Sequence, residues 1–189
     1  RIQVQRGVGT STNGSAAFGG SINILTNAAS DKPLFEINNT LGSFNTVKNS
    51  IGFSTGFIND KFEFSGRLSR IKSGGYIDRS GSKLRSYFLQ GIYKDENTLL
   101  KILTFAGHEI TDQAWFGIDS STLETNRKYN PAGEYYDKMG NNLYYNDQDD
   151  NYKQDHYQFH WNQSYENGWI SNLGLHYTYG RGYWENYNV

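Results

Sequence analysis

A glycine-rich stretch near the N-terminus is the first candidate for chemistry, because such loops can cradle phosphate groups. It reads RGVGTSTNGSAAFGGSINILT over residues 6–26. Gly9 and Gly14 have the spacing of a P-loop, but Ser15 stands where a P-loop carries the lysine that meets the phosphate charge. Thr12 likewise replaces the third glycine of a dinucleotide-binding loop, and a strand-like run follows where both motifs need a helix. The stretch therefore does not predict nucleotide binding.

Two histidines form the next candidate, a zinc site. His156 and His160 are four residues apart in the segment HYQFH. On a helix this spacing lets both rings bind one zinc ion, but on a strand the two residues lie about 13 Å apart. The alternating pattern around them favours a strand, so we expect ordinary polar histidines and no metal site.

An acidic run, DQDDN, is the third candidate. Asp147, Asp149 and Asn151 have the spacing that opens a calcium-binding loop, but Tyr152 stands at the required glycine and Gln158 at the required glutamate. An EF-hand is excluded, whereas a looser calcium site in a long loop stays open. No Gly-x-Ser-x-Gly elbow or other catalytic constellation is present. We therefore predict no catalytic residues, no cofactor and no enzymatic activity.

Aromatic residues are concentrated in one long segment without a strand pattern, residues 109–151. Rings with few rotamers on a loop are well suited to capture a ligand. The alternative, equally open, is that the rings only pack on neighbouring residues. The ligand-binding candidates are Trp115, Phe116, Tyr129, Tyr135, Tyr136, Tyr144 and Tyr145.

The elements around this segment are predicted from a period-2 alternation that runs through most of the chain. In TVKNSIGFSTGF, for example, Val47, Ile51 and Phe53 share one face and the small or polar residues take the other. Seven such runs indicate seven strands between residues 35 and 180. In two of them, 82–93 and 99–108, both faces are fairly apolar, so the sequence does not assign their two sides.

The connections between the runs alternate in length. Short turns (IND, KDEN, ENG) alternate with the longer segment KSGGYIDRSG and with the long segment 109–151. Outer-membrane barrels have short turns at one rim and longer loops at the other. Runs of about 9–12 residues also match a tilted membrane crossing. The pattern predicts an all-β antiparallel fold and favours a transmembrane barrel.

Composition narrows the function classes further. The chain of 189 residues has a net charge of -1, no cysteine, 16% aromatic residues and a mean hydropathy of -0.74. There is no global basic field, so we predict no nucleic-acid partner. No apolar run reaches the roughly 18 residues of a membrane helix. A soluble β-sandwich and a barrel with a wet lumen both fit this mixture.

The N-terminal stretch resembles the end of the plug domain of TonB-dependent outer-membrane receptors. That family reads Arg-Gly, a Gly/Ser-rich loop, and then Gly-x-x-Ala-x-Gly-Gly-x-Ile-Asn-Ile. The usual proline after Arg-Gly is Val8 here, a variant similar to receptors of the Bacteroidetes. The matching plug-motif residues are Arg6, Gly7, Gly14, Ala17, Gly19, Gly20, Ile22, Asn23 and Ile24.

The resemblance implies a domain organisation and a location. The family folds as a 22-stranded barrel with a plugged lumen. Residues 1–28 then end the plug, 29–34 form a linker, and 35–189 form the first seven or so barrel strands. Seven strands cannot close that barrel, so we expect a fragment of a longer receptor. The implied location is the outer membrane of a Gram-negative bacterium.

The resemblance also implies a function. It is energy-coupled uptake of a scarce solute such as an iron chelate (a siderophore), haem or cobalamin. The implied partners are that small-molecule ligand, outer-membrane lipid, and a TonB-type energy-transducing protein bound through a segment absent here. Gly20 would allow close backbone approach in the plug, and Arg6 would pair with carboxylates of the barrel wall. The alternative from another class is a soluble all-β carbohydrate-binding module.

Overall fold

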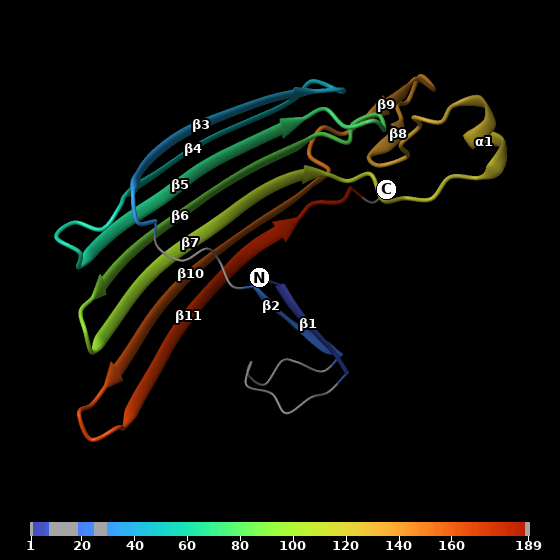
Figure 1. The fold of residues 1–189 in the computed structure, drawn as a ribbon. Coiled ribbons are helices and arrows are strands. Elements are labelled where there is room, and N and C mark those ends of the chain that lie inside the picture. Colours follow the sequence, from blue (N-terminus) through green and yellow to red (C-terminus); the bar gives the residue numbers. More distant parts are fainter. Residues whose placement is uncertain (1, 8–18, 25–29, 188–189) are drawn as a thin grey trace.

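The computed structural model describes residues 2–7, 19–24 and 30–187. Its centre is one seven-stranded antiparallel sheet in the order β11-β10-β7-β6-β5-β4-β3 (Figure 1). The strands of this sheet are β3 (Pro33–Gly42), β4 (Thr46–Thr55), β5 (Phe62–Ser73), β6 (Ser82–Lys94), β7 (Thr98–Asp112), β10 (Asp149–Ser164) and β11 (Ile170–Trp184). The predicted all-β antiparallel fold with seven strands is confirmed.

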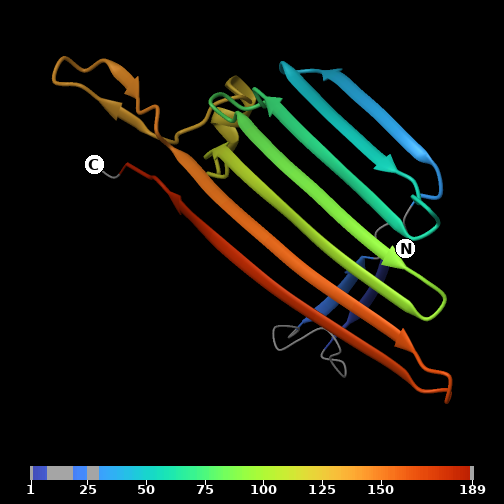
Figure 2. The same ribbon diagram turned by 90° about the vertical axis from the view of Figure 1, so that its left-hand side faces the viewer.

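The sheet is a meander in which each strand pairs with its neighbour along the chain, apart from the excursion between β7 and β10. The connections 56–61, 95–97 and 165–169 lie at one edge, which we call the short-turn edge. The connections 43–45, 74–81 and 113–148 lie at the opposite edge, the long-loop edge (Figure 2). The predicted separation of short and long connections is thus present, except that the turn 43–45 at the long-loop edge is short, as the sequence also indicated.

The longest connection, residues 113–148, has secondary structure of its own. It contains the short helix α1 (Ser120–Thr125) and a hairpin of β8 (Glu134–Tyr136) and β9 (Asn142–Tyr144). None of these three elements was predicted. The predicted segment 109–151 was too long at both ends, because β7 runs to Asp112 and β10 begins at Asp149.

Four of the seven strands are longer than the predicted 9–12 residues, whereas β3, β4 and β5 have the predicted length. β7 and β11 have 15 residues and β10 has 16. At about 3.3 Å per residue, β10 spans about 50 Å. The strands continue through polar residues at their long-loop ends. These residues interrupt the apolar alternation in the sequence, so the pattern predicted shorter strands.

The two faces of the sheet differ in composition, apart from β6 and β7, where both faces carry apolar residues. Cross-strand partners place Phe35, Phe53, Leu89 and Tyr157 on one face, and the residues next to them on the other. The second face is hollowed by a cavity of 1220 Å³ and is therefore the concave side of the curved sheet (Figure 1). The register also assigns the two sides of β6 and β7, which the sequence had left open.

Burial follows the opposite rule from that of a soluble protein. On the convex face Phe53, Leu68 and Ile102 are 44%, 59% and 62% exposed. On the concave face Ser54 and Glu63 are 9% and 0% exposed. Several polar side chains of the concave face are thus buried, whereas many large apolar side chains of the convex face are exposed.

A separate hairpin of β1 (Ile2–Arg6) and β2 (Gly20–Ile24) lies on the concave side of the sheet (Figures 1 and 2). The glycine-rich stretch leads into a strand, as predicted, and not into a helix. Among the described residues, no helix has the length and apolar character needed to cross a membrane.

Candidate ligand-binding surfaces

The plug-motif residues that the structure describes lie where the β1–β2 hairpin closes. Arg6 pairs with Gly20, and the Gly7 N–H donates to the Gly19 carbonyl at 3.0 Å. Gly7 has φ = +81°, a conformation that favours glycine, and a Cβ on Gly20 would lie 2.8 Å from the Gln5 carbonyl oxygen. The hairpin therefore needs glycine at both positions.

The structure describes only some of the other plug-motif residues. Arg6 is exposed and joins neither of the two ion pairs formed among the described residues. The backbone of Asn23 pairs with Gln3 in the hairpin. Gly14 and Ala17 lie outside the described residues.

The seven aromatic candidates form several small groups and not one cluster. Tyr135 and Tyr145 lie with ring centroids 4.1 Å apart, and Tyr145 stacks on Tyr187 at 3.6 Å. A hydrogen bond with Tyr187 raises the pKa of Tyr145 to about 12. Tyr187 follows β11 and was not among the candidates. This stack fastens the β8–β9 hairpin to the C-terminal segment, so two of the candidates support the loop.

Tyr129 and Tyr144 are likewise engaged inside the loop. The Tyr129 hydroxyl donates to Glu134, and this bond raises the pKa of Tyr129 to about 12. The Arg79 guanidinium lies over the Tyr144 ring, 3.5 Å from its centroid. Arg79 belongs to the neighbouring connection 74–81, so this contact joins the two long connections.

Three candidates remain open to solvent. Trp115, Phe116 and Tyr136 are 59%, 41% and 67% exposed. Trp115 and Phe116 are adjacent, with ring centroids 6.4 Å apart, whereas Tyr136 lies on β8. Of the seven residues, these three have free ring surface for a ligand at the long-loop edge.

The loop is held by buried amides that the sequence did not single out. Asn130 is 1% exposed, and its Nδ2 donates to the carbonyls of Asp78, Arg79 and Gln113 at 2.9, 3.2 and 2.9 Å. Its Oδ1 accepts from the Ala132 N–H at 3.0 Å. Every polar atom of this side chain is therefore used to fix one connection against the other.

Gln113 and Gln148 complete this polar core, with 1% and 6% exposure. The Gln113 N–H donates to the Gln148 carbonyl at 2.8 Å, and the Gln113 side chain donates to the Glu185 carbonyl. No signal in the sequence marks these two glutamines, because their side chains bind backbone groups far along the chain: the Glu185 carbonyl for Gln113 and the Tyr187 N–H for Gln148.

The concave cavity of 1220 Å³ is the second surface that could hold a ligand. His156, His160 and Gln158 of β10 line it together with Lys101 of β7. The rings of Phe105 and His156 stack with centroids 4.4 Å apart. Both histidines face the cavity as polar residues, as predicted: His156 Nδ1 lies 3.0 Å from Thr178 Oγ1, and His160 Nε2 lies 3.3 Å from Gln158 Oε1.

This surface supplies amide, imidazole and ammonium groups beside flat aromatic rings. Such a set can hold a polar or anionic ligand by hydrogen bonds. Among the described residues, no three His, Asp or Glu side chains gather as metal ligands. Asp149 and Asn151, two residues of the acidic run, lie within β10 and not in a loop.

Comparison with known protein families and curated protein sequences identifies no relative of this chain. No model of a known protein family matches the chain, and no curated protein sequence matches it.

Proposed function

We propose that this chain is part of the wall of a TonB-dependent outer-membrane receptor, with the end of its plug. The observation that carries the proposal is the convex face of the sheet, where large apolar side chains are exposed in continuous rows while Ser54, Glu63 and Gln90 are buried on the concave face. Soluble monomers rarely expose contiguous apolar patches beyond a few hundred Å². A lipid environment stabilises such a face, and a closed barrel would pair the free edges of β3 and β11.

The membrane location has support from a second feature, the extent of the apolar rows. On the convex face, the strand registers align residues into rows that cross the sheet from β5 to β11. Four successive rows begin at Phe62, Phe64, Gly66 and Leu68 of β5. All but two of the residues in these rows are apolar, aromatic or glycine. Those two are Thr104 and Asp155. At about 3.4 Å per residue, these rows cover about 20 Å along the strands. This is close to the apolar band of about 25 Å on membrane barrels.

The receptor function rests on the plug-like hairpin. The hairpin carries the motif Arg6-Gly7 and Gly19-Gly20 and lies on the concave, polar side, where a plug would lie inside a barrel. The proposed activity is uptake of a scarce solute such as an iron chelate, haem or cobalamin. The exposed rings of Trp115 and Phe116 would meet this ligand at the outer rim, and a TonB-type protein would drive its release inward.

The test uses the complete gene in its own host. Deletion should abolish growth on one defined iron or vitamin source, loss of the TonB-type protein should give the same defect, and the protein should fractionate with the outer membrane. Growth unchanged on all such sources would overturn the transport proposal. If the 189-residue chain were instead a stable monomer in buffer without detergent and bound a sugar, the carbohydrate-binding alternative would replace it.

A further inference from the structure

A row of polar and cationic side chains crosses the convex face where its apolar part ends, toward the long-loop edge. The strand registers align one residue from each of the seven strands. We call this set the cationic row: Asn39, Asn49, Arg70, Arg85, His108, Lys153 and Arg181. It lies directly above the row that contains Ile51, Leu68 and Tyr87, so charge and apolar surface meet along one line.

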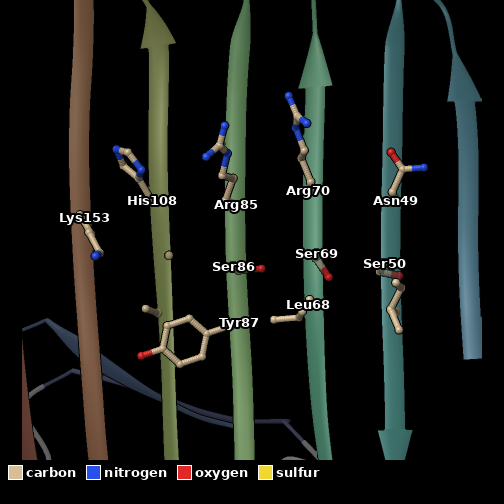
Figure 3. A pocket seen from close by; sticks show the side chains of 13 residues that line it. Asn49, Ser50, Leu68, Ser69, Arg70, Arg85, Ser86, Tyr87, His108 and Lys153 are labelled. Atoms are coloured by element: carbon tan, nitrogen blue, oxygen red, sulfur yellow. The ribbon is translucent and has the colours of Figure 1, made fainter. Parts of the chain in front are cut away.

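A hollow of 480 Å³ lies at this line (Figure 3). Arg70, Arg85 and Lys153 stand on its long-loop side, and Leu68 and Tyr87 lie on the opposite side. The hollow opens on the convex face, away from the concave cavity. It therefore belongs to a surface that the proposed transport function does not use.

Part of the charge of the row is not paired with a carboxylate. Arg181 pairs with Asp155 at 2.7 Å, but Arg70, Arg85 and Lys153 join neither of the two ion pairs formed among the described residues. Arg70 and Arg85 are direct cross-strand partners. Like charges directly opposite each other destabilise a sheet, so an anion bound between them would relieve this repulsion.

The next row toward the long loops repeats the pattern, since Lys72 and Lys83 are also cross-strand partners. Together with Arg70 and Arg85 they form a block of four cations on β5 and β6. The block extends the positive charge away from the apolar rows, in the direction that the headgroup region of a membrane would take.

We propose that the cationic row binds the phosphate groups of an anionic lipid in the leaflet nearer the long loops. The acyl chains of that lipid would lie along the apolar rows below it. Guanidinium groups bind phosphate oxygens in a bidentate manner. A free phosphate ion would use the cations alone, whereas an amphiphile matches both the charge and the apolar surface beside it. This inference rests on the proposed membrane location.

The test measures lipid binding to the complete receptor purified in detergent. The probe is bisphosphorylated lipid A, compared with lipid A of the same acyl chains from which both phosphates have been removed. Each cation near an anionic lipid surface contributes about 1 kcal/mol. The triple variant R70Q/R85Q/K153Q should therefore bind the phosphorylated probe about a hundredfold more weakly. It should bind the dephosphorylated probe as the wild type does.

Two further variants serve as controls. K32Q/K61Q/K94Q removes the same charge from exposed lysines at the short-turn edge and should leave binding unchanged. R70K/R85K/K153R keeps the charge and should retain most of the affinity, which separates loss of charge from misfolding. Inorganic phosphate alone should compete only at much higher concentration than the lipid.

The proposal is overturned if the triple variant binds the phosphorylated probe as tightly as wild type, if both probes bind wild type equally, or if inorganic phosphate competes as well as the lipid. These results leave the proposed function standing as long as the receptor fractionates with the outer membrane. A chain that is stable in buffer without detergent would instead overturn both proposals.

Discussion

The seven-stranded sheet and the connection 113–148 are stabilised in different ways. The sheet is held by long, regular ladders. Its convex side is mostly apolar up to the cationic row, and its concave side is mostly polar except on β6 and β7. The connection has almost no apolar core. Its buried residues include Gln113, Asn130 and Gln148, whose side chains bind backbone groups of distant segments.

The difference shows where specificity resides in each region. A residue of the sheet is constrained by the medium on its side, so many residues of similar polarity fit. A residue such as Asn130 is constrained by the individual atoms that it contacts, so nearly any replacement leaves a buried group without a partner. The sheet should therefore respond to changes of polarity, and the loop to changes of single hydrogen bonds.

The largest expected effect is that of a charge on the convex face. Ile102→Arg in the complete receptor, reconstituted in lipid vesicles, should lower the free energy of unfolding by about 2–4 kcal/mol, because the arginine would lie in the apolar part of the bilayer. Guanidinium-induced unfolding of the variant and the wild type measures this difference in free energy. In a soluble protein the same change at a residue 62% exposed would cost about 0.5 kcal/mol or less.

A matched variant on the other face makes this comparison sharp. Gln158 lies on the concave face of β10, one strand away from Ile102. Gln158→Arg places the same charge in the polar cavity and should change the free energy of unfolding much less. Equal effects of the two variants would contradict the assignment of the convex face to lipid.

The second prediction concerns the loop. Asn130→Ala removes the two N–H donors that three carbonyls share and the acceptor for the Ala132 N–H, and should cost about 2–3 kcal/mol of local stability. Hydrogen exchange over residues 113–148 should accelerate, while exchange in the strands stays as it was. Asn146→Ala, an exposed residue of the same loop, is the control and should have no effect. Faster exchange throughout the sheet would contradict an independent role for the loop.

The same contrast explains which parts of the structure could be predicted from the sequence. The strands were predictable because alternation is a local property: Ile51 and Phe53 reveal their face without any knowledge of their partners. The side of β6 and β7 was not predictable, since Leu84, Phe88, Leu103 and Phe105 are apolar residues that face the concave side. Only the register with neighbouring strands assigns them.

The candidate site was predictable only in part for the same reason. Aromatic content identified the segment, but it did not separate Trp115, which is exposed, from Tyr145, which stacks on Tyr187. That contact joins residues far apart in the chain, and no local pattern encodes it. The cationic row was not predicted either, because each strand contributes one residue and the row forms only in the folded sheet.

The third prediction tests whether the concave face also contains contacts of the loop type. Glu63 is fully buried there, and it accepts hydrogen bonds from Ser54 Oγ at 2.8 Å and Gln90 Nε2 at 3.4 Å. Ser54→Ala would leave a buried carboxylate oxygen without its nearest donor and should cost about 1–2 kcal/mol in chemical unfolding.

The control for Ser54 lies on the same strand and face. Ser50 is 5% exposed and forms no side-chain hydrogen bond among the described residues. Ser50→Ala should therefore change the free energy of unfolding by less than about 0.5 kcal/mol. If both serine variants had the same small effect, the concave face would be constrained by polarity alone, as the convex face is.

The smallest effect is expected at the exposed cap of α1. Asp119 accepts hydrogen bonds from the Ser121 hydroxyl at 2.6 Å, the Thr122 N–H at 2.8 Å and the Thr122 hydroxyl at 3.0 Å. The bond from Ser121, followed by those from Thr122, lowers the pKa of Asp119 from 3.8 to about 2. A lowered pKa means that the folded helix favours the ionised cap, so this contribution is fully present above about pH 4 and is lost as the pH falls through about 2.

Exchange of the Thr122 amide hydrogen, relative to the intrinsic rate at each pH, measures this cap directly. Protection should be constant above about pH 4 and should decrease toward pH 2 while the sheet amides remain protected. Asp119→Asn keeps a capping oxygen but cannot titrate, so its protection should be nearly independent of pH over that range. A decrease of equal size in the variant would assign the acid sensitivity to other carboxylates of the loop. The stability of the loop would then depend less on single hydrogen bonds than its contrast with the sheet requires.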